Sequence, residues 1–209
     1  MHYFEHRREA ERTLELVSLA GGQGAVYQAD IRVNHEIEAA MAAILQHRQR
    51  IDVVLCNAGT ASGHLVVTCP EHEWQRTLDT NLTGTYLCMK AAAKSMLPHG
   101  GGSILVIGSY AAFQGVSGQG AYAASKAGLI GLVKTAAREW GPHNIRVNLV
   151  SPGWQQTALA GDAFPPEGHF GDHVLGRASN LDEVAETISR LAQLSDVSGQ
   201  VWNMDSRIL

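Results

Sequence analysis

Two side chains near the middle of the chain have types and a spacing that suit proton transfer. Tyr122 and Lys126 are four residues apart in a segment with helical periodicity, so they project from one face, one turn apart. A tyrosine hydroxyl has an ordinary pKa of about 10, and a neighbouring ammonium group lowers that pKa. Ser109, at the end of an apolar run, could hydrogen-bond a substrate oxygen. Together the three could bind a carbonyl group and pass it a proton, although a Tyr-x-x-x-Lys pair alone is also common on exposed amphipathic helices.

The elements that must position these residues alternate along the chain. Short runs rich in Val and Ile predict strands, and longer segments of helical periodicity separate them, which is typical of βαβ units that form a parallel sheet. The expected strands are 25–29, 51–56, 103–107, 146–150 and 200–204, and the expected helices are 5–20, 34–50, 71–97, 120–141 and 181–195. Residues 153–180 are rich in Gly, Pro and Asp and predict a substrate-binding lid. We expect residues 1–209 to form one domain.

Composition narrows the class of partner. The formal net charge is -4, so no basic stripe is expected that would attract nucleic acid or an anionic membrane. No apolar run approaches the length of a membrane span. The cysteines Cys56, Cys69 and Cys88 form no C-x-x-C pair and predict no disulfide framework. These features indicate a cytoplasmic protein with a small-molecule partner.

Several motifs, in order along the sequence, resemble those of the classical short-chain dehydrogenase/reductases, most closely 3-oxoacyl-carrier-protein reductases and sugar-alcohol dehydrogenases. Asn81 in "DTNLTGTYL" resembles the helix asparagine of the family's catalytic tetrad, and Ser109, Tyr122 and Lys126 resemble its other members. The motif "NAG" resembles the family turn after a strand, "RVNLVSPG" resembles the strand and turn beside the nicotinamide, and an acidic residue follows "AVYQA" as it does near the adenine. The cofactor-binding residues that this resemblance implies are Asp30, Ile31, Asn57, Ala58, Gly59, Tyr122, Lys126, Pro152, Gly153 and Thr157.

The resemblance implies a fold and a reaction. The fold would be α/β, with a Rossmann-type doubly wound parallel sheet. The reaction would transfer a hydride between NAD(P)(H) and a carbonyl or secondary alcohol substrate. Tyr122 would exchange a proton with the substrate oxygen, and Lys126 would lower the pKa of Tyr122 and bind the nicotinamide ribose. Ser109 would polarise the carbonyl, and Asn81 would hold a water molecule. The helices near 71–97 and 120–141 resemble those of the family's dimer interface, which implies a homodimer or homotetramer.

The beginning of the chain departs from the family pattern. The family opens with a strand, a Gly-rich T-G-x-x-x-G-x-G turn and a helix, whereas "HYFEHRREAERTLELV" resembles the end of the second strand and a later helix. We therefore expect an N-terminally truncated sheet without the first strand and Gly-rich loop, and a gap of roughly 10 Å in that sheet. The "GGQG" at Gly21–Gly24 follows a helix and precedes a strand, so it predicts a helix stop rather than a phosphate loop.

This departure leaves alternatives open. The sequence could begin at an internal methionine of a longer chain, or it could be a truncated member that rebuilds its sheet with a partner subunit. It could also be a cofactor-deficient binding or regulatory protein, or a non-redox acid–base enzyme on the same fold. Arg7 and Arg8 favour NADP over NAD, although they could equally be solvated charges at a helix start.

The segment 153–180 also carries aromatic and histidine side chains. Trp154, Phe164 and Phe170 are expected to line the substrate pocket and exclude water. His169 and His173 lie close to an aspartate, but no evident further ligand accompanies them, so we expect no metal site.

Overall fold

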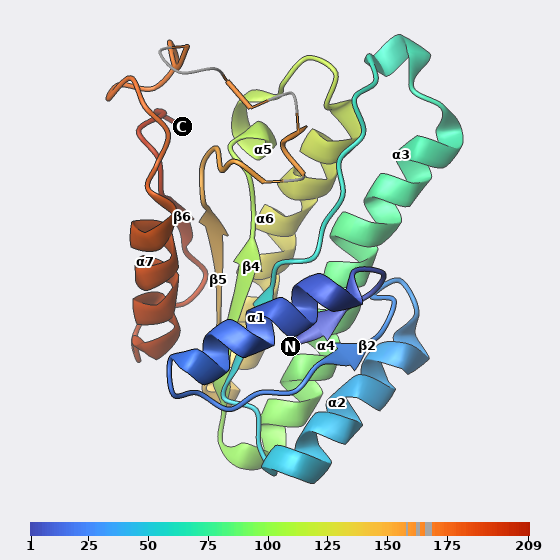
Figure 1. Ribbon diagram of the computed structural model, residues 1–209, viewed down its shortest axis with the longest axis vertical. Helices are drawn as coiled ribbons and strands as arrows, with labels where there is room; N and C mark the ends of the chain where they lie inside the picture. Colours follow the sequence, from blue (N-terminus) through green and yellow to red (C-terminus); the bar gives the residue numbers. More distant parts are fainter. Residues whose placement is uncertain (158, 162–163, 166–168) are drawn as a thin grey trace.

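The computed structural model of the chain describes residues 1–157, 159–161, 164–165 and 169–209. It has an α/β fold in which helices lie on both faces of parallel strands (Figure 1). The strands are β1 (His2–Tyr3), β2 (Tyr27–Gln28), β3 (Val53–Cys56), β4 (Gly102–Ile107), β5 (Ile145–Ser151) and β6 (Val201–Asn203). The α-helices are α1 (Arg7–Leu19), α2 (Asn34–Arg48), α3 (Glu71–Leu78), α4 (Thr85–Met96), α5 (Ala111–Gln114), α6 (Gly120–Trp140) and α7 (Leu181–Gln193).

The strands form two separate parallel sheets. One contains β1 and β2, and the other has the order β3-β4-β5-β6. The register of the larger sheet aligns Val54 with Ile104, and Ile104 with Val147. Among the described residues, no strand pairing joins the two sheets.

The larger sheet is the centre of the core because β4 and β5 are buried on both faces. Ile104 and Val147 have no exposed surface and contact Met89 of α4 and Leu129 of α6 through one cluster. On the other face Leu105 packs in a cluster with residues of α7. Burial on both faces explains why these strands read as continuous apolar runs in the sequence.

The helix predicted at 71–97 is interrupted. Between α3 and α4 the backbone forms a π-helical segment, Asp79–Gly84, which the sequence periodicity did not predict. An extra residue in one turn rotates the helix and is often found at functional sites. Asn81 lies within this segment and is fully buried.

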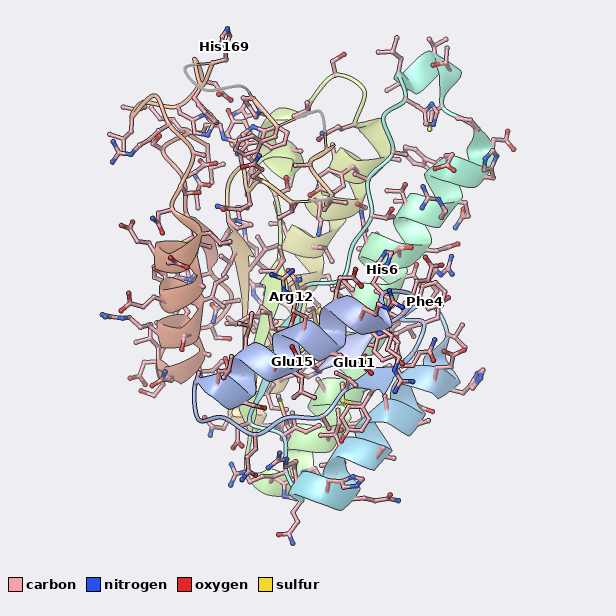
Figure 2. All side chains as sticks on the ribbon, in the orientation of Figure 1. Phe4, His6, Glu11, Arg12, Glu15 and His169 are labelled. Atoms are coloured by element: carbon pink, nitrogen blue, oxygen red, sulfur yellow. The ribbon has the colours of Figure 1, made fainter. Side chains whose placement is uncertain are left out.

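Helix α1 is weakly buried. It lies across the front of the molecule in Figure 1, and Figure 2 shows Glu11, Arg12 and Glu15 along it. Ala10 is its one buried residue. The helix ends before Gly21, whose φ of 81° suits glycine, so the predicted helix stop is confirmed. Within the described ranges, no helix is both long enough and apolar enough to cross a membrane.

Candidate active site

A cavity of about 600 Å³ lies where β3, β4 and β5 end. In open parallel sheets the carboxyl ends of the strands are the usual place for ligands. Nine residues predicted from the sequence line this cavity together: Asn57, Ala58, Gly59, Ser109, Tyr122, Lys126, Pro152, Gly153 and Thr157.

Tyr122 and Ser109 meet inside this cavity. Tyr122 lies in the first turn of α6, and Ser109 follows the end of β4, where its hydroxyl accepts a hydrogen bond from the Ala111 N–H at 3.2 Å. Burial raises the pKa of the Tyr122 phenol, and a hydrogen bond with Ser109 acts in the opposite direction. The phenol is therefore protonated at neutral pH.

Lys126 lies one turn further along α6 and is buried. Its ammonium nitrogen donates a hydrogen bond to the Ile107 carbonyl oxygen at 2.7 Å, and it lies 5.7 Å from the centroid of the Tyr122 ring. Burial lowers the pKa of Lys126 to about 8. The sequence predicts that Lys126 lowers the pKa of Tyr122. In this structure burial raises the pKa of Tyr122 and Lys126 is not among the influences on it, so that expectation stays a prediction.

Asn81 lies behind the cavity wall and joins two elements. Its Nδ2 donates to the Thr60 carbonyl at 2.8 Å and to the Ser125 hydroxyl at 3.1 Å, and its Oδ1 accepts from the Thr60 N–H at 2.8 Å. The loop after β3 is thereby tied to α6. Ser125 was missed by sequence reasoning, although its place directly before Lys126 was a signal that it lies near the site.

Gly59 has no side chain, so its backbone can lie close to the Asn81 amide and the Lys126 ammonium group. A Cβ at this position would lie 3.3 Å from the Asn81 Oδ1 and 3.8 Å from the Lys126 ammonium nitrogen. The contact with the Asn81 Oδ1 would be tighter than a Cβ normally makes, whereas the contact with the ammonium nitrogen would be an ordinary van der Waals contact. The glycine of the "NAG" motif therefore has a steric reason in this structure.

Asp30 and Ile31 lie outside this cavity. The Asp30 carboxylate accepts hydrogen bonds from the Arg32 side chain at 2.9 and 3.0 Å, which hold its pKa below the ordinary value. Ile31 packs against Gly84 and lines a different cavity. A role for these two residues near the adenine stays a prediction.

The aromatic residues of segment 153–180 form a chain of edge-on contacts. Trp154 contacts Phe164 with ring centroids 6.4 Å apart, and Phe164 contacts Phe170 at 6.0 Å. Trp154 lines the cavity, whereas Phe164 and Phe170 are not among the described residues of its wall. The expectation that all three line the pocket is therefore correct for Trp154 alone.

Arg207 is a further residue of the cavity wall that sequence reasoning missed. Its guanidinium carbon lies 4.0 Å from the centroid of the Tyr110 ring, next to Ser109 in the chain. Its Nε donates to the buried Asp205 carboxylate at 2.9 Å. No local sequence pattern indicated that this residue near the C-terminus would reach the cavity.

These residues fit one end of a nicotinamide cofactor. Asn57 and Gly59 follow β3, and Pro152 and Gly153 follow β5, so they reach the cavity from the two strands that flank β4. The open wall at Gly59 and the buried ammonium group suit a polar ribose next to a flat ring. The fit extends to the nicotinamide and its ribose, while Asp30 lies outside the cavity.

A parallel α/β sheet with Ser, Tyr and Lys side chains at its carboxyl edge defines a class of oxidoreductases. The comparisons with known proteins agree with this geometry. The profile of the family described as Enoyl-(Acyl carrier protein) reductase matches residues 1–206. The chain belongs to the short-chain dehydrogenase/reductase family.

Relatives and solved structures support the same assignment. A 3-oxoacyl-[acyl-carrier-protein] reductase of Synechocystis is 33% identical over 208 residues, which cover 98% of this chain and 84% of the relative. A human protein of the same name is 32% identical, covering 88% and 78%. A short-chain type dehydrogenase/reductase from Mycobacterium marinum superposes with a TM-score of 0.90 at 28% identity, covering 96% of this chain and 82% of that one. A short chain dehydrogenase from Mycobacterium smegmatis gives 0.85 at 28%, covering 100% and 81%.

Proposed function

We propose that this protein reduces a carbonyl group to a secondary alcohol with NAD(P)H, and that Tyr122 is the proton donor. The observation that carries the proposal is that Ser109, Tyr122 and Lys126 line one cavity at the carboxyl ends of the strands. Reduction is the favoured direction because a protonated phenol is the form that donates to a carbonyl oxygen.

The side chains of this chain would divide the work as follows. The Ser109 hydroxyl would donate a hydrogen bond to the carbonyl oxygen and hold it beside Tyr122. The Tyr122 hydroxyl would give its proton to that oxygen as negative charge develops there. Lys126, which is charged below its pKa of about 8, would stabilise the phenolate left behind. Bound NAD(P)H supplies the hydride in this chemistry.

The cofactor-binding residues are part of the same proposal. Asn57, Ala58 and Gly59 would contact the nicotinamide ribose from one side, and Pro152, Gly153 and Thr157 would contact the nicotinamide from the other. Asp30 and Ile31 would lie toward the adenine. The exposed bases Arg7 and Arg8 support a preference for NADP over NAD.

The proposed substrate class is a 3-oxoacyl thioester. It is supported by the names of the Synechocystis and human relatives, and residues 153–180 would act as the lid over such a substrate. A homodimer or homotetramer is also proposed, through surfaces of α3, α4 and α6. Trp74 and Tyr86 support it, since 40% and 43% of their surfaces are exposed.

A steady-state assay tests the function. NADPH and NADH oxidation would be followed by absorbance with acetoacetyl thioester and a panel of ketones, with product identified by mass spectrometry. Tyr122→Phe should lower kcat/KM by about 1000-fold. Tyr3→Phe, in β1 and outside the cavity wall, is the matched control and should leave it unchanged. Unchanged turnover by Tyr122→Phe, or product formed with no dinucleotide added, would overturn the proposal.

A further inference from the structure

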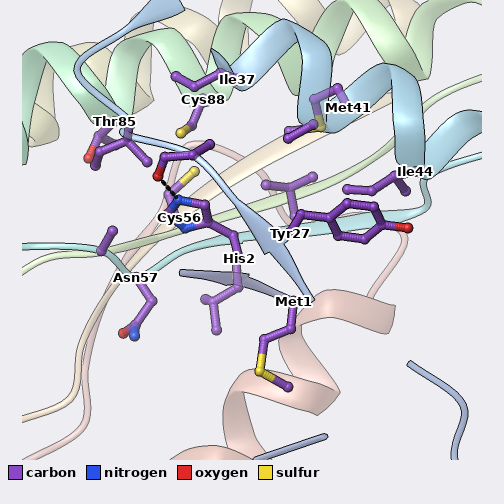
Figure 3. A pocket seen from close by; sticks show the side chains of 16 residues that line it. Met1, His2, Tyr27, Ile37, Met41, Ile44, Cys56, Asn57, Thr85 and Cys88 are labelled. Carbon is purple, nitrogen blue, oxygen red and sulfur yellow. Dashed lines mark hydrogen bonds between the residues drawn. The ribbon is translucent and has the colours of Figure 1, made fainter. Parts of the chain in front are cut away.

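Two charged side chains stand in the wall of the catalytic cavity. Among its described lining residues these are Lys126 and Arg207, and no carboxylate is among them. A smaller cavity, shown in Figure 3, has mostly apolar walls with Ile37 and Met41 on its helical side, and its described lining contains no Lys, Arg, Asp or Glu. Lys126 has a place in the proposed reaction. Arg207 is therefore a cation of the catalytic cavity that the proposed reaction does not use.

Arg207 is held by its backbone and by its side chain. The Asn203 Nδ2 donates to the Arg207 carbonyl oxygen at 2.8 Å, and the Arg207 N–H donates to the Asp205 Oδ1 at 2.9 Å. The Arg207 Nε donates to the Asp205 Oδ2 at 2.9 Å, and its Nη2 donates to the same oxygen. The guanidinium carbon lies 4.0 Å from the centroid of the Tyr110 ring. An arginine fixed in this way loses little conformational freedom when it binds a ligand.

The third nitrogen of this guanidinium group is left for a ligand. Nη1 lies 3.8 Å from the Asp172 carboxylate, which is too far for a hydrogen bond, and no other residue of the described ranges accepts a hydrogen bond from it. The Arg207 side chain is only 7% exposed. A buried donor without an acceptor costs free energy. An oxygen atom of a ligand in the cavity would remove this cost.

The pair of Asp205 and Arg207 contacts the segments that follow β4 and β5. Tyr110, under the guanidinium group, directly follows Ser109 in the chain, and both line the cavity. On the other segment, a Cβ at Gly153 would lie 2.6 Å from the Asp205 Cβ, so Asp205 packs directly against the turn after β5. A substrate whose ketone contacts Ser109 would therefore have Arg207 within the same part of the cavity wall.

The charges around Arg207 decide which kind of oxygen suits it. The Asp205 carboxylate is fully buried and balances the charge of Arg207. The Asp172 carboxylate lies near Nη1 and is 55% exposed. A carboxylate or phosphate group of a ligand would lose its water and lie close to these two negative charges, which disfavours it. A neutral carbonyl oxygen would accept the same hydrogen bond without this repulsion.

We propose that Arg207 determines substrate specificity by donating a hydrogen bond from Nη1 to a second, neutral carbonyl oxygen of the substrate. The favoured substrates are esters, thioesters or amides that carry this carbonyl close to the ketone that is reduced. Simple ketones lack the acceptor, and free keto acids carry a charge that the two carboxylates repel. The inference rests on the proposed function, because it names the part of the substrate that the same cavity selects. Arg207 takes no part in the transfer of the hydride or the proton.

A binding assay on the unmodified chain tests the inference without turnover. The probes are ethyl acetoacetate, methyl pentyl ketone, which has the same chain length but lacks the second carbonyl, and acetoacetate, which carries a carboxylate. Each would be titrated by calorimetry with and without NADP⁺, the oxidised cofactor, which cannot donate a hydride. We expect ethyl acetoacetate to bind about tenfold or more tightly than either of the other two.

Two arginine substitutions show whether this selectivity comes from Arg207. Arg207→Lys keeps a positive charge beside Asp205 but removes the Nη1 donor. It should weaken binding of the ester by about tenfold or more and leave binding of the ketone unchanged. Arg190 also pairs with a carboxylate, that of Glu186, but lies exposed on α7, so Arg190→Lys is the matched control and should keep the selectivity. Circular dichroism would confirm folding, and the unmodified chain still supplies the test if Arg207→Lys does not fold.

Four results would overturn the inference. They are equal affinity for the ester and the ketone, tighter binding of acetoacetate than of the ester, unchanged selectivity in Arg207→Lys, and no binding of any probe at about 10 mM. Turnover separates the inference from the proposed function. NADPH oxidation with equal kcat/KM for the ester and the ketone would overturn the inference alone. Ester-selective binding that depends on Arg207, without oxidation of NADPH or NADH, would overturn the proposed function and leave the recognition by Arg207 standing.

Discussion

The Lys126 ammonium nitrogen donates a hydrogen bond to the Ile107 carbonyl oxygen at 2.7 Å, within a site that leaves the lysine 4% exposed. This bond anchors α6 to the end of β4 next to Ser109 and Tyr122. A single carbonyl does not replace the water that a charged ammonium group loses on burial. Burial of the Lys126 ammonium group therefore lowers the free energy of unfolding, although the proposed reaction needs this group.

The first prediction concerns this cost. Burial lowers the pKa of Lys126 to about 8 from an ordinary value of 10.5, so between these pH values the unfolded chain binds more protons than the folded chain. The contribution of Lys126 to the free energy of unfolding should rise by about 3 kcal/mol as pH rises through this window, and be lost again as pH falls. Lys126→Met should consequently be the more stable protein at pH 7, with the difference shrinking toward pH 10.5.

Urea unfolding at a series of pH values measures this effect. Subtracting the free energy of unfolding of Lys126→Met from that of the unmodified chain removes the contribution of the other titrating groups. Lys134, exposed on the same helix, provides the control, since Lys134→Met should show no such pH dependence. A Lys126→Met protein that is less stable than the unmodified chain at pH 7 would contradict the argument.

The second prediction concerns the Tyr122 phenol. Burial raises its pKa, and the hydrogen bond with Ser109 is the influence that lowers it. Ser109→Ala should therefore raise the pKa of Tyr122 further. The phenolate absorbance of each protein, minus that of the same protein carrying Tyr122→Phe, isolates this one titration from the other tyrosines.

A serine elsewhere on β4 supplies the comparison. Ser103 is buried at the opposite end of that strand, so Ser103→Ala should leave the Tyr122 titration unchanged. A Tyr122 titration that begins below the ordinary value of 10.0 would show that Lys126, rather than burial, dominates the phenol.

Much of the fold could be predicted because its signals are local. The apolar runs of β4 and β5 reflect burial on both faces, and the periodicity of α6 places Tyr122 and Lys126 on one side. The turns after β3 and β5 follow directly from strand ends, so their residues arrive at one edge of the sheet. For these reasons nine predicted site residues meet in one cavity.

Other features of the fold and the site depend on backbone geometry or on side-chain contacts that a sequence pattern does not show. Helical periodicity over 71–97 is continuous in the sequence, so it could not show the π-helical segment that positions Asn81. The sequence did not show that the Asp30 carboxylate is held by Arg32, and a role of Asp30 near the adenine stays a prediction. Arg207 reaches Tyr110 from the far end of the chain, and no local pattern predicts that contact.

The third prediction concerns Asn81, whose side chain makes three hydrogen bonds without exposure to water. Asn81→Ala would leave the partly buried N–H and C=O of Thr60 without their partner, and unpaired groups of this kind cost free energy in addition to the lost bonds. We expect the free energy of unfolding to fall by about 3 kcal/mol. Ser125→Ala removes one of the three bonds and should cost about 1 kcal/mol.

The double variant separates this structural role from a catalytic one. If Asn81 and Ser125 act through their mutual bond, the cost of Asn81→Ala should be smaller when Ser125 is already Ala, by about 1 kcal/mol. Hydrogen exchange at the Thr60 amide should increase in Asn81→Ala and stay slow in Ser125→Ala, because only Asn81 accepts from that N–H. If Asn81→Ala unfolds at the same urea concentration as the unmodified chain, the bridge between the loop after β3 and α6 does not stabilise the fold. Asn81 would then be retained for holding the water molecule that the family resemblance implies, rather than for structure.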